Sequence, residues 1–347
     1  MKRLAMRLGP AALAVVLGFL ALAIGLTASG YDGAAALAAI FRGALGSPDA
    51  IVSGLLPRAI PLILVGLGIA LGFRAGALNI GAEGQFYAGA IAATWIGLHV
   101  AAWPRPAGVT AVLIVGALAG TLWILGPAIL RLRFGVLEVI STLLLNFVAD
   151  ALVSWMVQGP LQEHQRVYPE SDPLPLAARL PALPGTRLHL GLAIALLLAV
   201  GLWFFERRTL PGFQLRATGA NSVAAEIMGR INTRRAFLLS LLASGALAGL
   251  AGAAEVSGIS FALFQNLSPG YGFTGIAVAL LARLDPLGVV ATSLLFAGLE
   301  AGASAMQRDA GVPAVAVSIV ESVIILVVLL ADVVRRRRLA TADSSGL

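Results

Sequence analysis

Apolar stretches of about twenty residues recur along this 347-residue chain and constrain its fold more than any other feature. A helix of that length crosses the hydrocarbon core of a bilayer while satisfying its own backbone hydrogen bonds. Nine such stretches are Pro10–Ala28, Ile51–Leu71, Gln85–Ala102, Val109–Leu130, Val136–Val157, Leu190–Phe205, Ala236–Val256, Pro286–Ala305 and Pro313–Val334. The composition agrees, with 59% apolar and only 12% charged residues. The sequence therefore predicts an all-α fold, a polytopic bundle of transmembrane helices.

A tenth, weaker stretch at Ile259–Ala282 carries Pro269, Gly270, Gly272 and Gly275. Proline removes a helical hydrogen bond, and closely spaced glycines weaken a helix further. We therefore expect this stretch to be broken, and broken membrane helices commonly line cavities. The prediction is about ten membrane segments, one or two of them broken.

The basic residues predict the orientation, because Lys and Arg accumulate in cytoplasmic loops. With both termini in the cytoplasm, most of the 24 basic residues fall on the cytoplasmic side. Residues 158–189, rich in proline, then form an exposed, semi-rigid extracytoplasmic loop, and residues 206–235 form a cytoplasmic loop. The run Arg335–Arg338, within a cytoplasmic tail at 335–347, is expected to face anionic lipid and not nucleic acid. Residues 1–347 form one transmembrane domain.

Several kinds of chemistry are excluded by what the sequence lacks. It contains no cysteine, and its three histidines stand apart without metal-ligand spacing, so we expect no metal site. We interpret these histidines, His189 among them, as solvated loop residues. Neither a GxxxxGK[ST] loop nor a GxGxxG turn after a strand occurs, so another subunit must bind any ATP that is used. No paired acid, base or nucleophile indicates an enzyme.

One predicted span carries a row of polar residues at intervals of four: Glu138, Thr142, Asn146 and Asp150. Residues four apart lie on the same side of a helix. Because polar groups are costly in hydrocarbon, this row must face protein or water. It either lines the path of a polar solute or joins neighbouring helices by hydrogen bonds, and the sequence leaves both interpretations open.

A second polar cluster lies in Phe73–Gln85, where glycines bracket Asn79, Glu83 and Gln85. Such a segment cannot be an ordinary lipid-facing helix. It is either a cytoplasmic turn or a broken, buried segment that meets solute at membrane depth.

Two further segments are informative. Gly212–Gly229 is too polar to span a bilayer, and it is interpreted as a docking helix in which Ala220, Ala224, Ala225 and Met228 share one side and Asn221 lies near the start. In Ser244–Ala253, Gly245, Gly249 and Gly252 form a small-residue face, which predicts close packing between helices.

These motifs carry a resemblance that spans roughly Ile51 to Val334. The segments are FRAGALNIGAEGQFYAGA at Phe73–Ala90, EVISTLLLNFVA at Glu138–Ala149, LRATGANSVAAEIMG at Leu215–Gly229, SGALAGLAGA at Ser244–Ala253 and GYGFTGIAVALLARLDPLG at Gly270–Gly288. Together they resemble the permease subunits of bacterial ABC importers in the branched-chain amino acid and simple-sugar group. Within that group the similarity is greatest to nucleoside and simple-sugar permeases that depend on basic-membrane-protein lipoproteins.

The resemblance implies a multi-pass permease subunit in the bacterial cytoplasmic (inner) membrane, which imports nucleosides or related simple sugars by alternating access. Its partners would be a second, paralogous permease, a cytoplasmic ABC ATPase and an extracytoplasmic substrate-binding lipoprotein. The ATPase would bind ATP and Mg²⁺, so neither a cofactor nor a catalytic residue is expected in this chain.

The resemblance also implies two sets of site residues. Those expected to couple to the ATPase are Gly219, Ala220, Asn221, Ala224, Ala225, Met228 and Gly229. Those expected near the solute path are Asn79, Glu83, Gln85, Glu138, Thr142, Asn146, Tyr271 and Phe273. An ion-coupled secondary transporter of a small polar solute is the alternative, and the Glu138 row keeps it open.

Overall fold

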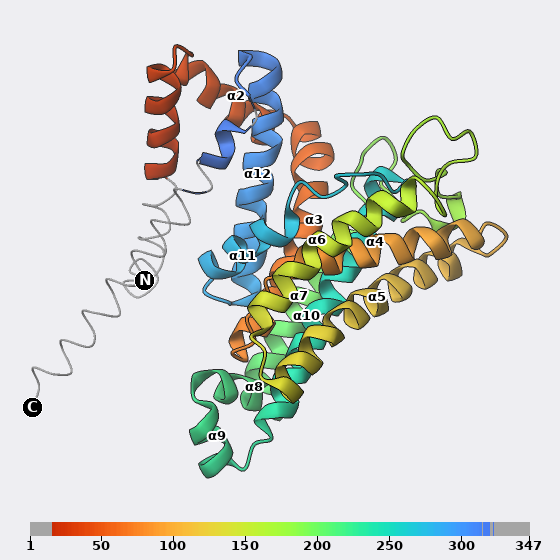
Figure 1. Ribbon diagram of the computed structural model, residues 1–347. Coiled ribbons are helices and arrows are strands. Elements are labelled where there is room, and N and C mark those ends of the chain that lie inside the picture. The colour runs from red at the N-terminus through yellow and green to blue at the C-terminus, as the bar shows by residue number, and fades with distance from the viewer. Residues whose placement is uncertain (1–15, 314, 320–321, 323–347) are drawn as a thin grey trace, which may run out of the picture. The chain divides into compact units, whose positions relative to one another are not determined.

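The computed structural model describes residues 16–313, 315–319 and 322, and these residues are mostly helical (Figure 1). They form no strand, and two isolated β-bridges, Glu170 with Phe264 and Ala182 with His189, are the β-type pairing between them. The chain divides into two compact units. One is Leu56–Leu294, and the other comprises the described residues of Met1–Leu55 and Leu295–Leu347. The predicted all-α fold is confirmed for the described part of the chain.

The larger unit is built around α10, which packs against α3, α4 and α5. Its elements are α3 (Leu56–Arg74), α4 (Ala82–His99), α5 (Arg105–Phe134), α6 (Glu138–Val157), η2 (Leu176–Ala178), α7 (Gly191–Arg208), α8 (Leu210–Ala220), α9 (Ser222–Gly229), α10 (Thr233–Glu255), η3 (Val256–Ser260), α11 (Tyr271–Leu281) and the first part of α12 (Pro286–Ala310). The short α8 and α9 lie at one end of this unit, away from the 158–189 loop (Figure 1).

Among the described residues, five helices are long and apolar enough to cross a membrane: Ala50–Arg74, Arg105–Phe134, Glu138–Val157, Thr233–Ser260 and Pro286–Ala310. They support a polytopic membrane protein. The predicted break within Ile259–Ala282 is confirmed, because irregular backbone separates η3 from α11. The stretch Pro313–Val334 and the tail at 335–347 fall largely or wholly outside the described residues.

The smaller unit contains a helix at Val16–Ala28, then α2 (Gly33–Leu45), η1 (Ala50–Leu55) and the rest of α12. Helix α2 was not predicted from the sequence, because its 13 residues are shorter than a membrane span. Its start has a clear local cause: the Asp32 carboxylate accepts a hydrogen bond from the Ala35 N–H at 2.9 Å. Ile40 of α2 packs against Gly302 of α12.

The predicted small-residue face of α10 is confirmed as a packing surface. Gly249 lies against the backbone of Gly116 and Gly120 in α5, and Gly252 lies against the carbonyl of Phe86 in α4. A Cβ atom at either α10 glycine would overlap those backbone atoms. The three helices therefore approach to backbone contact, which increases dispersion contacts where the hydrophobic effect gives little drive.

We expect Gly249→Ala to lower the free energy of unfolding of the purified protein by about 1–3 kcal/mol, because the added methyl group overpacks the α5–α10 contact. Denaturation in mixed micelles measures this. Gly126→Ala in α5 is the matched control, since the position has nothing within 4 Å of a built Cβ atom. Equal stability of the two variants would contradict the packing argument.

The 158–189 loop is less exposed than the sequence analysis expected. Its backbone bonds to the irregular segment after α10: Ser171 N–H donates to the Leu263 carbonyl at 2.8 Å, and Leu180 N–H donates to the Ser257 carbonyl at 2.8 Å. Leu174 and Ala178 are fully buried. The loop therefore covers η3 and the chain that follows, and does not project freely from the helices.

His189, at the end of this loop, is buried, so its interpretation as a solvated residue is wrong. Only 3% of it is exposed, and its ring packs against Gly191 and Gly258. The Gly191 N–H donates to Nδ1 at 3.2 Å. Burial lowers the pKa of the His189 imidazole from 6.5 to about 4, so the folded protein keeps the ring neutral.

We expect this buried ring to make stability depend on pH. Between pH 6.5 and about 4 the unfolded chain binds a proton that the folded chain does not, so stability falls as the pH falls, by up to about 3 kcal/mol. Melting temperatures at pH 7 and pH 5 measure the effect. His189→Gln should flatten the dependence, whereas His99→Gln, at an exposed position, should not. An unchanged slope in His189→Gln would contradict the assignment.

Candidate functional site

The segment interpreted as one docking helix is two helices, α8 and α9, which meet at Asn221. The Asn221 backbone is extended, and its side-chain oxygen accepts a hydrogen bond from the Ala224 N–H at 3.0 Å. Asn221 therefore ends α8 and starts α9, as an N-cap asparagine does. The prediction that Ala220, Ala224 and Ala225 share one side of a helix is wrong, because Ala220 belongs to α8.

Two apolar side chains of α9 project into solvent. Val223 is 65% exposed and Ile227 is 74% exposed, whereas Ala225 is buried. The other described positions of the predicted coupling set, Gly219, Ala220, Asn221, Ala224 and Gly229, are exposed. The side chain of Met228 lies outside the described part of the structure. Val223 and Ile227 were not among the predicted coupling residues, although their spacing of four places them on one side of α9.

The coupling segment, α8 with α9, is attached to the helix bundle through backbone contacts at both ends of α8. A Cβ atom at Gly219 would overlap the carbonyl of Arg74 at the end of α3, and one at Gly212 would overlap the carbonyl of Phe205 in α7. Thr209 caps the start of α8 by accepting from the Gly212 N–H at 3.1 Å. These contacts leave no room for a side chain between α8 and the ends of α3 and α7.

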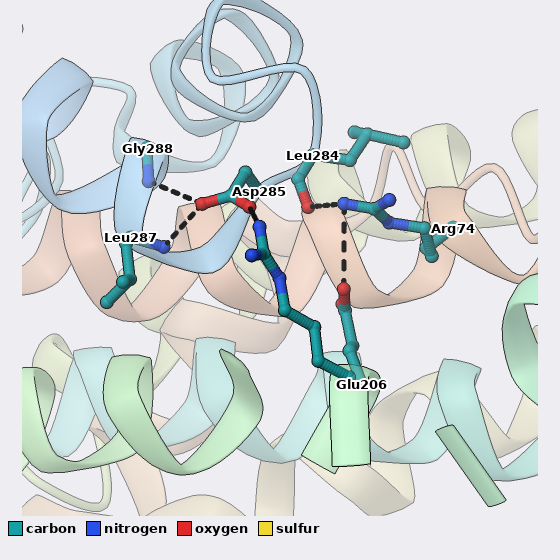
Figure 2. Close-up of polar contacts among 7 residues, drawn as sticks. Arg74, Glu206, Leu284, Asp285, Leu287 and Gly288 are labelled. Carbon is teal, nitrogen blue, oxygen red and sulfur yellow. Dashed lines mark hydrogen bonds and ion pairs between the residues drawn. The ribbon is translucent and has the colours of Figure 1, made fainter. Parts of the chain in front are cut away.

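The same ends of α3 and α7 hold the turn between α11 and α12 (Figure 2). The Arg74 guanidinium donates to the carbonyl of Leu284 and forms an ion pair with Glu206 at 3.5 Å. Next to it, Arg207 pairs with Asp285 at 2.6 Å. We call Arg74, Glu206 and Arg207 the arginine clamp.

The turn held by the clamp is conformationally demanding. Arg283 and Leu284 both have positive φ, 53° and 60°, a region that costs non-glycine residues about 1–2 kcal/mol each. Asp285 then caps α12, because its carboxylate accepts from the N–H groups of Leu287 and Gly288, each at 3.1 Å (Figure 2). The bond from Arg74 to the Leu284 carbonyl and the pairing of Arg207 with Asp285 thus fix a turn that its own residues disfavour.

The predicted solute-path residues Asn79 and Gln85 form a buried cluster with Ser244 of α10. Asn79 and Gln85 exchange two hydrogen bonds, at 2.8 and 2.9 Å, and Asn79 also donates to the Ser244 hydroxyl at 2.9 Å. The Asn79 side-chain oxygen additionally accepts from the Gly81 N–H at 2.9 Å. The segment before α4 is therefore broken, and its Asn79 side chain is buried and hydrogen-bonded within the protein.

The cluster continues into α6 and α11. Asn146 accepts from the Gly84 N–H at 2.8 Å and donates to the Ile80 carbonyl at 3.0 Å. Glu83 accepts from the Gly272 N–H at 2.6 Å, which joins the start of α4 to the start of α11.

The other members of the polar row in α6 have different surroundings. Glu138 pairs with Arg131 of α5 at 3.1 Å, and the Thr142 hydroxyl donates to the Glu138 carbonyl at 2.7 Å within α6. Asp150 is exposed. Glu138 and Asn146 thus have partners outside α6, which favours the helix-joining interpretation for them, whereas the Thr142 hydroxyl bonds within α6.

The structure brings most of the predicted path residues together around the start of α4. Tyr271 is also buried, with its ring centroid 5.8 Å from that of Phe86. Phe273, two residues along α11, is instead 47% exposed. The arginine clamp was missed altogether, because its residues lie 78 or more positions from their partners on the turn and no local pattern predicts such pairs.

We expect Asn79→Ala to destabilise the purified protein by about 1–3 kcal/mol, because it leaves the buried Gln85 amide short of partners. The double variant Asn79→Ala/Gln85→Ala should lose less than the sum of the two single variants. Thr94→Val is the control, since the buried Thr94 hydroxyl donates within its own helix. Strict additivity in a denaturation cycle would contradict a direct pair.

Comparison with known proteins places these features in a family context. Residues 51–331 match the family model described as branched-chain amino acid transport system / permease component. The chain is 39% identical to the guanosine ABC transporter permease protein of Bacillus subtilis, over 94% of each chain. It is 34% identical to the nucleoside ABC transporter permease protein of Lactococcus lactis, over 90% of this chain and 88% of the other. It is 36% identical to the glucose ABC transporter permease protein of Haloferax volcanii, over 83% and 78%.

Proposed function

The chain belongs to the family of permease components of branched-chain amino acid transport systems, and from this premise we propose that it carries a nucleoside or a related simple sugar through an ATP-driven importer. It is a multi-pass membrane protein and a permease subunit of an ABC importer. The choice of solute rests on the names of its relatives, which include guanosine, nucleoside and glucose permeases.

The observation that carries the proposal is the surface of α9. A short, capped helix presents Val223 and Ile227 to solvent, at the end of the unit away from the 158–189 loop. Exposed apolar side chains on a rigidly attached helix are suited to a groove on a protein partner. We assign that partner as the ABC ATPase, which would bind ATP and Mg²⁺. The coupling residues then include Val223 and Ile227 beside Gly219, Asn221, Ala224 and Gly229.

The proposed topology follows from this assignment. Residues 206–235 face the cytoplasm of a bacterium, residues 158–189 face the outside, and both termini are cytoplasmic within about ten membrane segments. A second permease completes the path, and a substrate-binding lipoprotein delivers the solute at the outer face. The whole of 1–347 acts as one transmembrane permease domain, with 335–347 as its cytoplasmic tail.

Transport would proceed by alternating access. ATP binding closes the ATPase pair and displaces α8 and α9, and the permease pair then exposes its solute site to the other side. The proposed path passes the exposed Phe273 and Asp150, while Asn79, Gln85 and Asn146 hold the backbone beside it. Glu83, Glu138, Thr142 and Tyr271 belong to the same supporting layer. Because the partner ATPase would hydrolyse the ATP, we expect this chain itself to break no covalent bond.

An ion-coupled secondary transporter is the less supported candidate. It would leave the exposed side of α9 without a role, and Glu138 is paired with Arg131 and so is a poor carrier of a coupling ion. The relatives compared above are named as ABC permeases.

We expect Ile227→Asp to abolish ATP-driven uptake of radiolabelled guanosine or glucose in proteoliposomes that hold the complete importer. The charge removes the apolar contact with the ATPase but leaves folding intact, because the position is 74% exposed. Ile227→Leu, which keeps the contact apolar, is the control and should transport normally. Full uptake by Ile227→Asp would contradict the assignment of α9 as the docking helix. Wild-type uptake that does not depend on ATP would contradict the proposal of an ATP-driven importer.

A further inference from the structure

One helix, α11, contacts the proposed solute path at its start and leads at its end into the turn that the arginine clamp holds. At its start, the Gly272 N–H donates to Glu83 of α4 at 2.6 Å. The Ser268 hydroxyl accepts from the N–H groups of Gly270 and Tyr271, which fixes the same end. After its last residue, Leu281, the chain enters the turn at 283–285 that the clamp holds. The helix thus joins two places that the proposed mechanism must connect.

The clamp is contacted directly by the coupling segment. Gly219, the next-to-last residue of α8, lies against the carbonyl of Arg74, and Gly212, near the start of α8, lies against Phe205 and Glu206. These contacts are with backbone atoms and leave no space for a side chain, so movement of α8 toward the ends of α3 and α7 pushes directly on them. Those ends carry the arginine clamp.

The clamp binds two successive residues of the 283–285 turn. Arg74 binds the Leu284 carbonyl, and Arg207 binds the Asp285 carboxylate (Figure 2). Since Asp285 also caps α12, a pull on its side chain acts on the first turn of α12.

Two contacts hold α11, one with the start of α12 and one with α3. The Thr292 hydroxyl of α12 donates to the Val278 carbonyl of α11 at 3.0 Å. Gly275 of α11 lies against Val65 of α3 with no space for a larger residue. A helix held in this way shifts as a body and does not bend locally. Displacement of the turn therefore reaches Tyr271 and Phe273.

We propose that the arginine clamp transmits displacement of α8 and α9 through the 283–285 turn and α11 to the solute path. Arg74, Glu206 and Arg207 are thus positioning residues for transport, which touch neither ATP nor solute. This inference rests on the proposed function. It adds the physical route by which ATPase movement changes the solute site.

A purely structural role for the clamp makes a different prediction. The Arg207–Asp285 pair is half-exposed, with 54% and 33% of the two side chains accessible, and exposed ion pairs add little to stability. Losing it should therefore leave folding and assembly intact. Only a transmission role makes its loss change how much solute moves for each ATP hydrolysed.

The first test measures uptake and ATP hydrolysis together in proteoliposomes holding the complete importer. Arg207→Gln and Asp285→Asn should each assemble and hydrolyse ATP while uptake per ATP falls about fivefold or more. Asparagine at 285 can still cap α12, so its effect isolates the ion pair. The double variant should be no worse than either single one. Arg208→Gln, at the exposed next position, should match the wild type.

The second test follows α11 directly. The chain contains no cysteine, so Phe273→Cys introduces a single thiol at an exposed position of α11. We expect ATP to change its rate of labelling by a maleimide, and Arg207→Gln to remove that change whereas Arg208→Gln keeps it. An ATP-dependent change that survives Arg207→Gln would overturn the route.

The outcomes separate this inference from the proposed function. If wild-type uptake requires ATP and the clamp variants keep the wild-type uptake per ATP, only the transmission route is wrong. Additive losses in the double variant would also overturn it, because they would show that the two residues act separately. If wild-type uptake does not depend on ATP, the proposed function itself is wrong, whatever the clamp variants do.

Discussion

Backbone contact between α10 and its neighbours is the constraint on which the rest of the larger unit depends. Gly249 and Gly252 leave no gap for a side chain against α5 and α4, so these helices pack at the closest distance that a polypeptide allows. In a membrane this contact replaces the hydrophobic drive that water would supply. The resulting core is rigid, and movement must occur where elements meet through side chains.

The polar residues before and along α4 show how such a core tolerates a broken backbone. Asn79, Gln85 and Ser244 satisfy one another, and Asn146 supplies partners to the Gly84 N–H and the Ile80 carbonyl. An unpaired buried amide would cost about 1–3 kcal/mol, so the pairing allows irregular chain where a regular helix would otherwise be required. The same network fixes Glu83 against the start of α11. Polar groups near a solute path can thus serve to hold the path's walls.

The sequence was informative wherever a property is local. Apolar length predicted the five described helices that can cross a membrane, the glycines of α10 predicted close packing, and Pro269 with its neighbouring glycines predicted the break before α11. Asn221 was placed near the start of a helix but not recognised as the end of the preceding one, since a cap residue and a helix residue differ only in backbone angles. His189 was misjudged because burial depends on which chain segment covers it. The arginine clamp could not be predicted for a similar reason, because two helix ends distant in sequence create it.

The clamp holds the turn through polar contacts, and its Arg207–Asp285 pair is half-exposed. A well-packed apolar contact is rigid and costly to open, whereas a half-exposed ion pair exchanges readily with water at little net cost. The turn that it holds contains two residues with positive φ, so releasing the clamp would let a disfavoured backbone relax. The glycine-packed core and the ion-paired turn therefore have different roles. The core keeps the helices as rigid bodies, and the turn is where one helix could shift relative to another. In the proposed route, charge at this position links the turn to α3 and α7 while the glycine-packed interior stays intact.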